Sequence, residues 1–242
     1  MRVPRLYLDE TLAEELDVTL SADQPHYITN VLRLDVGNTV HLYNARCGEF
    51  AGKISAAKKG EVTVTLDNKL GDFVAPKLRI HLCLGLSRGD RMDYAIQKAV
   101  ELGAERITPF QSEFGEVRFK QSDRAQKKVQ HWQRIAISAS EQCGRLDVPE
   151  IDSPVDFARC MQMATDTTPL LFDPAAEQSL HEVKIDGAVT VFTGPEGGFS
   201  PAELEMAKTS NCQLVKLGPR VLRTETAPVA VLSVLQHRFG DL

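Results

Sequence analysis

The strongest constraint on the fold is a change in hydrophobic periodicity along the chain. Val62, Val64 and Leu66 alternate with polar residues, which is the period of half-buried strands. After Pro76, short apolar runs alternate with segments such as 90–102, whose apolar residues recur at helical spacing. Strands that alternate with helices predict a mostly parallel α/β sheet. The chain therefore has two parts of different architecture.

The first part is predicted to be a small barrel of short strands with one helix. We expect a strand at 2–8, a helix at 23–34 capped by Ser21 or Asp23, strands near 40–42 and 62–66, and turns at Gly37-Asn38 and Lys59-Gly60. The segment 70–76 lacks periodicity and ends in proline. We therefore predict one domain at 1–72 and a second at 73–242.

The second part is predicted to be the α/β domain. Its expected strands are 78–86, 106–110, 169–172, 188–193 and 213–217, and its expected helices are 90–102, 122–143, one that begins at Ser200, and 228–239. No apolar run approaches the roughly 18 residues that a membrane helix needs. The basic N-terminus soon becomes acidic at Asp9-Glu10, so we expect no signal peptide.

The five cysteines are scattered along the chain without a Cys-x-x-Cys pair. This spacing fits neither a zinc site nor a disulfide framework, so we expect no metal and unpaired thiols in a reducing cytoplasm.

Basic residues cluster between Arg118 and Arg134, although the net charge of the chain is −5. Six cations lie in this stretch with a single acid, Asp123. Clustered cations can bind phosphate groups even on an acidic protein. A solvated helix face explains the same pattern, so charge alone does not decide between the two interpretations.

The loop Thr193–Ser200 contains the run Gly-Pro-Glu-Gly-Gly between an apolar strand and a helix. Ser200 suits the N-cap, Pro201 the first turn, and Glu203 completes a capping box. Glycines let the backbone approach a ligand closely, and ligands of parallel sheets bind at the carboxyl ends of strands. The loop lacks the P-loop and dinucleotide-binding patterns. A plain turn would need fewer glycines, so we favour a ligand-binding loop.

A second loop, Leu217–Ala227, also follows a strand and precedes a helix. Helix capping would explain Thr224 or Thr226, and Glu225 would favour a helix start through the macrodipole. Capping leaves two arginines, Arg220 and Arg223, without an explanation.

Several segments of the chain resemble the SPOUT superfamily of methyltransferases. The similarity is closest to the RsmE family, which methylates N3 of a uridine in 16S ribosomal RNA. The segments that carry it are Met1–Tyr7, His26–Arg33, Gly85–Met92, Glu141–Arg145, Gly194–Gly198 and Leu217–Ala227. The chain departs from the family pattern at Arg88, where lysine is common, and at Phe114, where arginine often stands.

The resemblance implies an α/β SPOUT domain with a deep trefoil knot, preceded by a PUA-like β-barrel that binds RNA. It implies a cytoplasmic homodimer that acts on the small ribosomal subunit with S-adenosyl-L-methionine as cofactor. The implied cofactor-binding residues are Leu171, Phe172, Thr193, Gly194, Pro195, Glu196, Gly197, Gly198, Leu217, Gly218, Val221, Leu222, Thr226 and Ala227. The expected RNA-binding residues are Arg5, Arg33, Arg88, Arg91, Arg118, Lys120 and Arg145.

The reaction itself indicates catalytic residues. Uridine N3 is a poor nucleophile until it loses its proton, so the site needs a base or cations that stabilise the resulting anion. Glu225 is the candidate base, and Arg220 and Arg223 are the candidate anion stabilisers. Two alternatives stay open: ribose 2′-O-methylation of RNA, and a non-catalytic RNA-binding assembly factor with the same fold.

Overall fold

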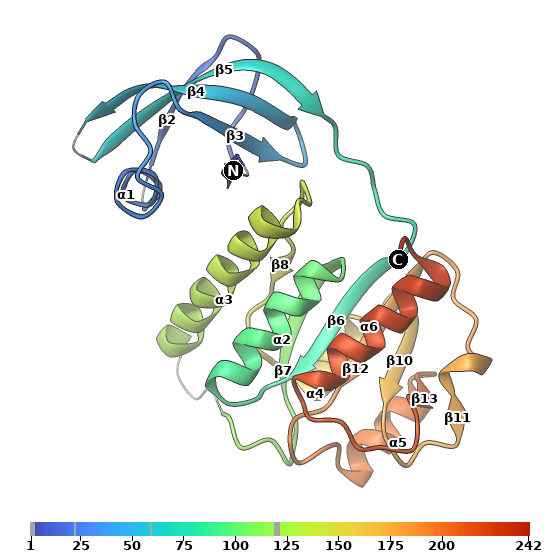
Figure 1. The fold of residues 1–242 in the computed structure, drawn as a ribbon. Coiled ribbons are helices and arrows are strands. Elements are labelled where there is room, and N and C mark those ends of the chain that lie inside the picture. The colour runs from blue at the N-terminus through green and yellow to red at the C-terminus, as the bar shows by residue number, and fades with distance from the viewer. Residues whose placement is uncertain (1–2, 22, 59, 119–121) are drawn as a thin grey trace. The chain divides into compact units, whose positions relative to one another are not determined.

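A computed structural model describes residues 3–21, 23–58, 60–118 and 122–242. The chain forms two compact units, and the division falls between Ala75 and Pro76 (Figure 1). The first unit also contains the distant segment Ser140–Val148, which the sequence did not indicate.

The first unit is built on a five-stranded sheet. Its strands are β1 (Arg5–Tyr7), β2 (Asp17–Leu20), β3 (Thr39–Asn44), β4 (Gly48–Lys58) and β5 (Glu61–Gly71), in the order β1-β3-β4-β5-β2. β1 and β3 are parallel, and the other pairs are antiparallel. The expected helix is α1 (Gln24–His26), which continues as a π-helical turn at Tyr27–Val31. Asp23 is its N-cap but makes no side-chain cap hydrogen bond.

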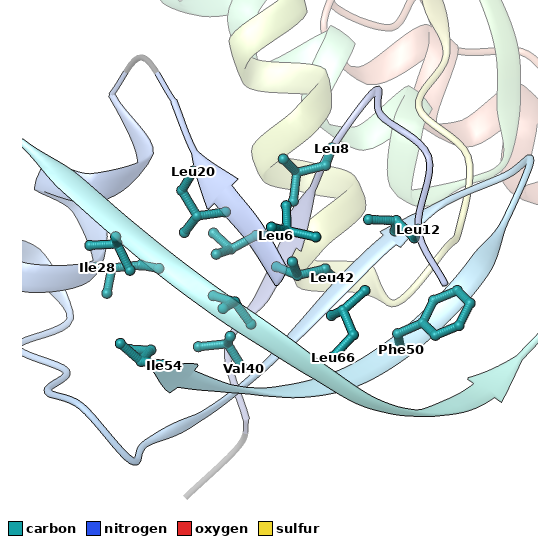
Figure 2. Close-up of a cluster of buried hydrophobic side chains, with 13 residues drawn as sticks. Leu6, Leu8, Leu12, Leu20, Ile28, Val40, Leu42, Phe50, Ile54 and Leu66 are labelled. Atoms are coloured by element: carbon teal, nitrogen blue, oxygen red, sulfur yellow. The ribbon is translucent and has the colours of Figure 1, made fainter. Parts of the chain in front are cut away.

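A hydrophobic cluster fills this unit (Figure 2). Leu6, Leu20, Val40, Ile54 and Leu66 reach it from each of the five strands. The alternating side chains predicted at 62–66 are buried as expected. No pairing between described residues joins β1 to β2, so the sheet encloses its core without closing into a hydrogen-bonded barrel.

Arg5 explains why Ser140–Val148 belongs to the first unit. Its guanidinium forms an ion pair of 2.7 Å with Glu49 and donates hydrogen bonds to the carbonyl oxygens of Ser140, Glu141 and Arg145. The Tyr7 backbone N–H donates to the Glu141 carboxylate at 3.1 Å. These contacts join residues far apart in sequence, which local patterns cannot reveal.

The second unit contains an eight-stranded sheet in which every pair is parallel. Its strands are β6 (Arg79–Gly85), β7 (Ala104–Gln111), β8 (Glu150–Ile151), β9 (Val155–Asp156), β10 (Thr168–Phe172), β11 (Gln178–Ser179), β12 (Ala188–Thr193) and β13 (Gln213–Lys216). The order is β11-β13-β10-β12-β6-β7-β8, and β9 also pairs with β7. The predicted parallel α/β sheet is confirmed.

Helices follow or precede the parallel strands along the chain (Figure 1). They are α2 (Gly89–Glu101), α3 (Ser122–Cys143), α4 (Phe157–Gln162), α5 (Pro201–Thr209) and α6 (Thr226–Phe239). The apolar stripe predicted for 90–102 is buried at Met92, Ile96 and Val100. Gln236 on α6 donates a hydrogen bond to the Leu102 carbonyl at the end of α2. No helix in the described ranges has the length and apolar character to cross a membrane.

Candidate cofactor site

Three neighbouring strands of the second unit end at the same edge of the sheet. β10 lies between β12 and β13, with Phe172 beside Thr193 on one side and Val215 on the other. The carboxyl ends of adjacent parallel strands meet at one edge, where ligands of α/β proteins bind. The loops that follow these strands therefore face a common space.

A cavity of about 300 Å³ occupies this space. Its lining residues are Arg91, Phe172, Asp173, Pro174, Gly194, Pro195, Glu196, Gly198, Phe199, Leu217, Gly218, Arg220, Val221, Leu222, Arg223, Thr224, Ala227 and Val231. They come from the loops after all three strands and from the helices α2 and α6. The two glycine-bearing loops singled out in the sequence thus line one cavity.

The loop between β12 and α5 has the geometry that its sequence predicts. Ser200 and Glu203 form the expected capping box, in which the Ser200 hydroxyl accepts from the Glu203 backbone N–H. At Gly194, a Cβ atom would lie 3.0 Å from the Phe199 ring. A larger residue would therefore displace the ring that lines the cavity.

Glu203 also connects this loop to the end of β7. Its buried carboxylate accepts hydrogen bonds from the Ser112 hydroxyl and the Glu113 backbone N–H, both at 2.9 Å. The Ser112 hydroxyl also lies 3.1 Å from the Gly198 carbonyl oxygen. The capping box already accounted for Glu203 in the sequence, so nothing local indicated this second role.

The loop between β13 and α6 presents its two arginines to solvent at the cavity. Arg220 and Arg223 are exposed, while Thr224 beside them is buried and lines the cavity. Glu225 is half-buried, does not line the cavity, and accepts a hydrogen bond of 3.2 Å from the Thr224 hydroxyl. Glu225 is the N-cap of α6 and makes no side-chain cap bond, so side-chain capping by Thr224 or Thr226 is wrong.

Most of the expected cofactor-binding residues line the cavity, and four do not. The four are Leu171, Thr193, Gly197 and Thr226. Leu171 and Thr193 are buried residues of β10 and β12. Sequence reasoning missed Asp173, although it directly follows the predicted strand 169–172. It also missed Pro174, Phe199, Thr224 and Val231.

The polar groups of the cavity have opposite charges. The Arg91 guanidinium pairs with the Glu196 carboxylate at 2.9 Å, which holds the first turn of α2 against the glycine loop. Asp173 supplies a second carboxylate. Within the described ranges, no group of three or more His, Cys, Asp or Glu side chains is arranged to hold a metal. The apolar residues of the lining, such as Phe172 and Val231, and its polar groups suit an organic ligand with an apolar body and hydrogen-bonding groups.

The expected RNA-binding residues differ in how accessible they are. The side chains of Arg5 and Arg145 are only 7% and 13% exposed and are engaged by Glu49 and Asp147. Arg33 and Arg118 are exposed, and Arg88 is exposed but paired with Glu116. Arg91 lines the cavity. Lys120, like Lys59 of the predicted hairpin turn, lies outside the described residues.

Family models match both parts of the chain. Residues 75–236 match a model described as an RNA methyltransferase domain, and residues 20–67 match one described as an RNA methyltransferase PUA domain. The chain thus combines an N-terminal PUA domain with a methyltransferase domain on a parallel sheet.

Curated and solved relatives agree with these matches. A protein of Buchnera aphidicola subsp. Schizaphis graminum, named ribosomal RNA small subunit methyltransferase E, is 35% identical over 100% of this chain and 98% of its own length. A methyltransferase from Legionella pneumophila, solved with bound SAM, has a TM-score of 0.96 at 34% identity, with both chains fully covered. A ribosomal RNA small subunit methyltransferase E from Neisseria gonorrhoeae, bound to S-adenosyl methionine, has a TM-score of 0.91 at 32% identity, again with both chains fully covered.

Proposed function

Because this chain belongs to the ribosomal RNA small subunit methyltransferase E family, we propose that it methylates N3 of a uridine in 16S ribosomal RNA with S-adenosylmethionine as cofactor. The observation that carries the proposal is the cavity at the ends of β10, β12 and β13, with Arg220 and Arg223 at its lining. It combines a concave site for an organic cofactor with cations suited to an anionic reactant.

The cavity suits S-adenosylmethionine in both size and chemistry. Its volume of about 300 Å³ lies at the lower end of ligand-binding pockets. Apolar residues such as Phe172, Leu217 and Val231 would contact the adenine, and the backbone of Gly194 and Gly218 would offer hydrogen bonds. Bound there, the cofactor supplies a methyl group that its positive sulfonium already makes electrophilic.

The residues of the second loop would prepare the nucleophile. Arg220 and Arg223 lie where they can stabilise the negative charge that spreads over N3 and the flanking carbonyl groups of a deprotonated uracil. We keep Glu225 as the base that removes the N3 proton, because its hydrogen bond to Thr224 holds its carboxylate next to a residue that lines the cavity. Catalytic hydrogen bonds often tighten only in the complex with substrate, so Glu225 would approach N3 once the RNA is bound.

We also propose the trefoil knot, the homodimer and the cytoplasmic location that the family resemblance implies. The strand order β13-β10-β12-β6, and the return of α6 to α2 through Gln236 and Leu102, support a knot in which the last segments pass through an earlier loop. Val221 at the cavity is 79% exposed, an apolar side chain of the kind that a second subunit would cover.

Nucleoside analysis of ribosomal RNA tests the proposed activity. In cells that lack this protein, mass spectrometry should show the loss of one N3-methyluridine from 16S RNA, and the purified protein should restore it in vitro. N3 methylation stops reverse transcription because it blocks the pairing edge, whereas ribose 2′-O-methylation leaves that edge free. Absence of S-adenosylhomocysteine binding by calorimetry would instead favour the non-catalytic assembly factor.

A further inference from the structure

A second cavity in the same unit adjoins the first turn of α2. Arg91 of this turn lines the first cavity, whereas Arg88, Gly89 and Met92 line the second. The second cavity has a volume of about 270 Å³. Its other lining residues are Leu86, Ser87, Val117, Arg118, Arg124, Lys128 and Trp132. One helical turn therefore connects the cofactor cavity to a second concave site that has no role in the mechanism above.

The charge of this second cavity is uniformly positive. Four of its lining residues are cations and none is an acid. Arg88 is neutralised by Glu116, and Arg118 donates a hydrogen bond of 2.7 Å to the Glu113 carbonyl oxygen. Arg124 and Lys128 have no ion-pair partner among the residues that the structure describes. The cavity thus keeps a surplus of positive charge that an anion would neutralise.

The floor of the second cavity is apolar and buried. Leu86, Met92 and Trp132 have exposed fractions of only 1%, 1% and 2%. The Trp132 indole N–H donates to Asp93 on α2 at 3.2 Å, which fixes the ring between the two helices. A charged rim over an apolar floor differs from a solvated helix face, because it offers contacts to both parts of an amphipathic ligand.

We propose that this cavity binds one nucleotide of single-stranded RNA next to the target uridine. Arg118, Arg124 and Lys128 would contact its phosphate group, and its base would lie against the half-buried side chain of Val117, above the buried floor. The volume suits a single nucleotide, and sequence-specific RNA recognition commonly uses unstacked bases held in this way. This inference rests on the proposed function, since it deepens the assignment of RNA as the substrate.

Two matched double variants of α3 test the phosphate contact. Arg124→Ala with Lys128→Ala removes two cations of the cavity, and Lys127→Ala with Arg134→Ala removes two exposed cations of the same helix outside it. Fluorescence anisotropy with labelled hexauridylate measures the affinity at several salt concentrations. The first pair should weaken binding about tenfold and flatten the salt dependence by a slope of about 0.7, as the loss of one phosphate contact requires. Equal losses in both pairs, or no loss in the first, would overturn the proposal.

Filling the cavity tests the contact with the base. Val117→Trp keeps every charge, so it should weaken hexauridylate binding about tenfold while the salt slope stays unchanged. Unchanged affinity in a folded Val117→Trp protein would contradict the nucleotide pocket. Two measurements on the wild type separate the nucleotide pocket from the proposed activity. They are the binding of S-adenosylhomocysteine and the transfer of a methyl group. A wild type that binds hexauridylate through this cavity but transfers no methyl group would overturn only the proposed activity.

Discussion

The Glu203 carboxylate on α5 accepts a hydrogen bond of 2.9 Å from the Ser112 hydroxyl at the end of β7. The same carboxylate accepts from the backbone N–H groups of Glu113 and Ser200, so Glu203→Ala would leave these two donors without their acceptor. We expect this variant to lower the free energy of unfolding by about 2–3 kcal/mol. Because the bonds to Ser112 and Glu113 hold the loop between β12 and α5 to the end of β7, cofactor affinity should fall as well. Urea unfolding and calorimetry measure the two effects.

Glu205→Ala is the matched control for this prediction. It removes the same charge from an exposed position of the same helix. Its stability and cofactor affinity should match those of the wild type, since surface substitutions usually change stability by less than about 0.5 kcal/mol. If both variants lost the same stability, the link between Glu203 and Ser112 would have no special importance.

Gly85, the last residue of β6, permits a close approach of the glycine loop. A Cβ atom at this position would lie 2.5 Å from the Pro195 backbone nitrogen and 2.8 Å from the Gly194 carbonyl carbon. Gly85→Ala must therefore push the loop away from β6, and we expect at least a tenfold loss of affinity for S-adenosylhomocysteine by calorimetry, which corresponds to about 1.4 kcal/mol. Gly71→Ala, at the end of β5, has open space around its Cβ atom and should bind normally. Unchanged affinity in Gly85→Ala would show that the loop position does not matter for binding.

His81 on β6 should make stability depend on pH. Burial, together with the nearby Arg106 guanidinium, lowers the pKa of His81 to about 4, although Asp152 acts in the opposite direction. Between this value and the usual pKa of about 6.5, the unfolded chain binds a proton that the folded chain does not. The contribution of His81 is therefore fully present above about pH 6.5, decreases by up to about 1.4 kcal/mol per pH unit as pH falls, and is lost as pH passes below the folded value.

Urea unfolding at several pH values between about 4 and 6.5 measures the slope of the free energy of unfolding against pH. His81→Gln should reduce it, because glutamine does not titrate. His237→Gln, an exposed position on α6, should keep the slope of the wild type. A slope that survives in His81→Gln would mean that other groups cause the pH dependence.

Sequence patterns predicted the longest helix and both glycine-bearing loops, because these features are encoded within short stretches. The helix 122–143 and the strand 188–193 have the predicted bounds, since their apolar periods run from end to end. Strands of two residues, such as β8, are too short to show any period. The contacts of Arg5 with Ser140 and Arg145 depend on tertiary structure, so the membership of 140–148 in the first unit was not predictable.

The candidate site likewise contains residues that a local sequence signal predicted and residues that it did not. Loop composition predicted Gly194 and Gly218, because glycine-rich turns after strands are a local signal. Asp173 has no such signal beyond its place after a strand. The second role of Glu203 was hidden, since a capping box explains glutamate at that position completely.

Arg223 provides the sharpest test of the proposed mechanism. Its guanidinium is exposed at the cavity, and no ion pair within the described ranges holds it. If it stabilises the anion of the deprotonated base, Arg223→Ala should lower kcat by about 100-fold or more, as the loss of one preorganised donor does in other enzymes. Calorimetry should show that S-adenosylhomocysteine still binds. Arg223→Lys keeps the charge but loses the planar fork, so its kcat should lie between those of the wild type and Arg223→Ala. Normal turnover by Arg223→Ala would remove this residue from the mechanism, and a parallel loss of cofactor affinity would make it a binding residue instead.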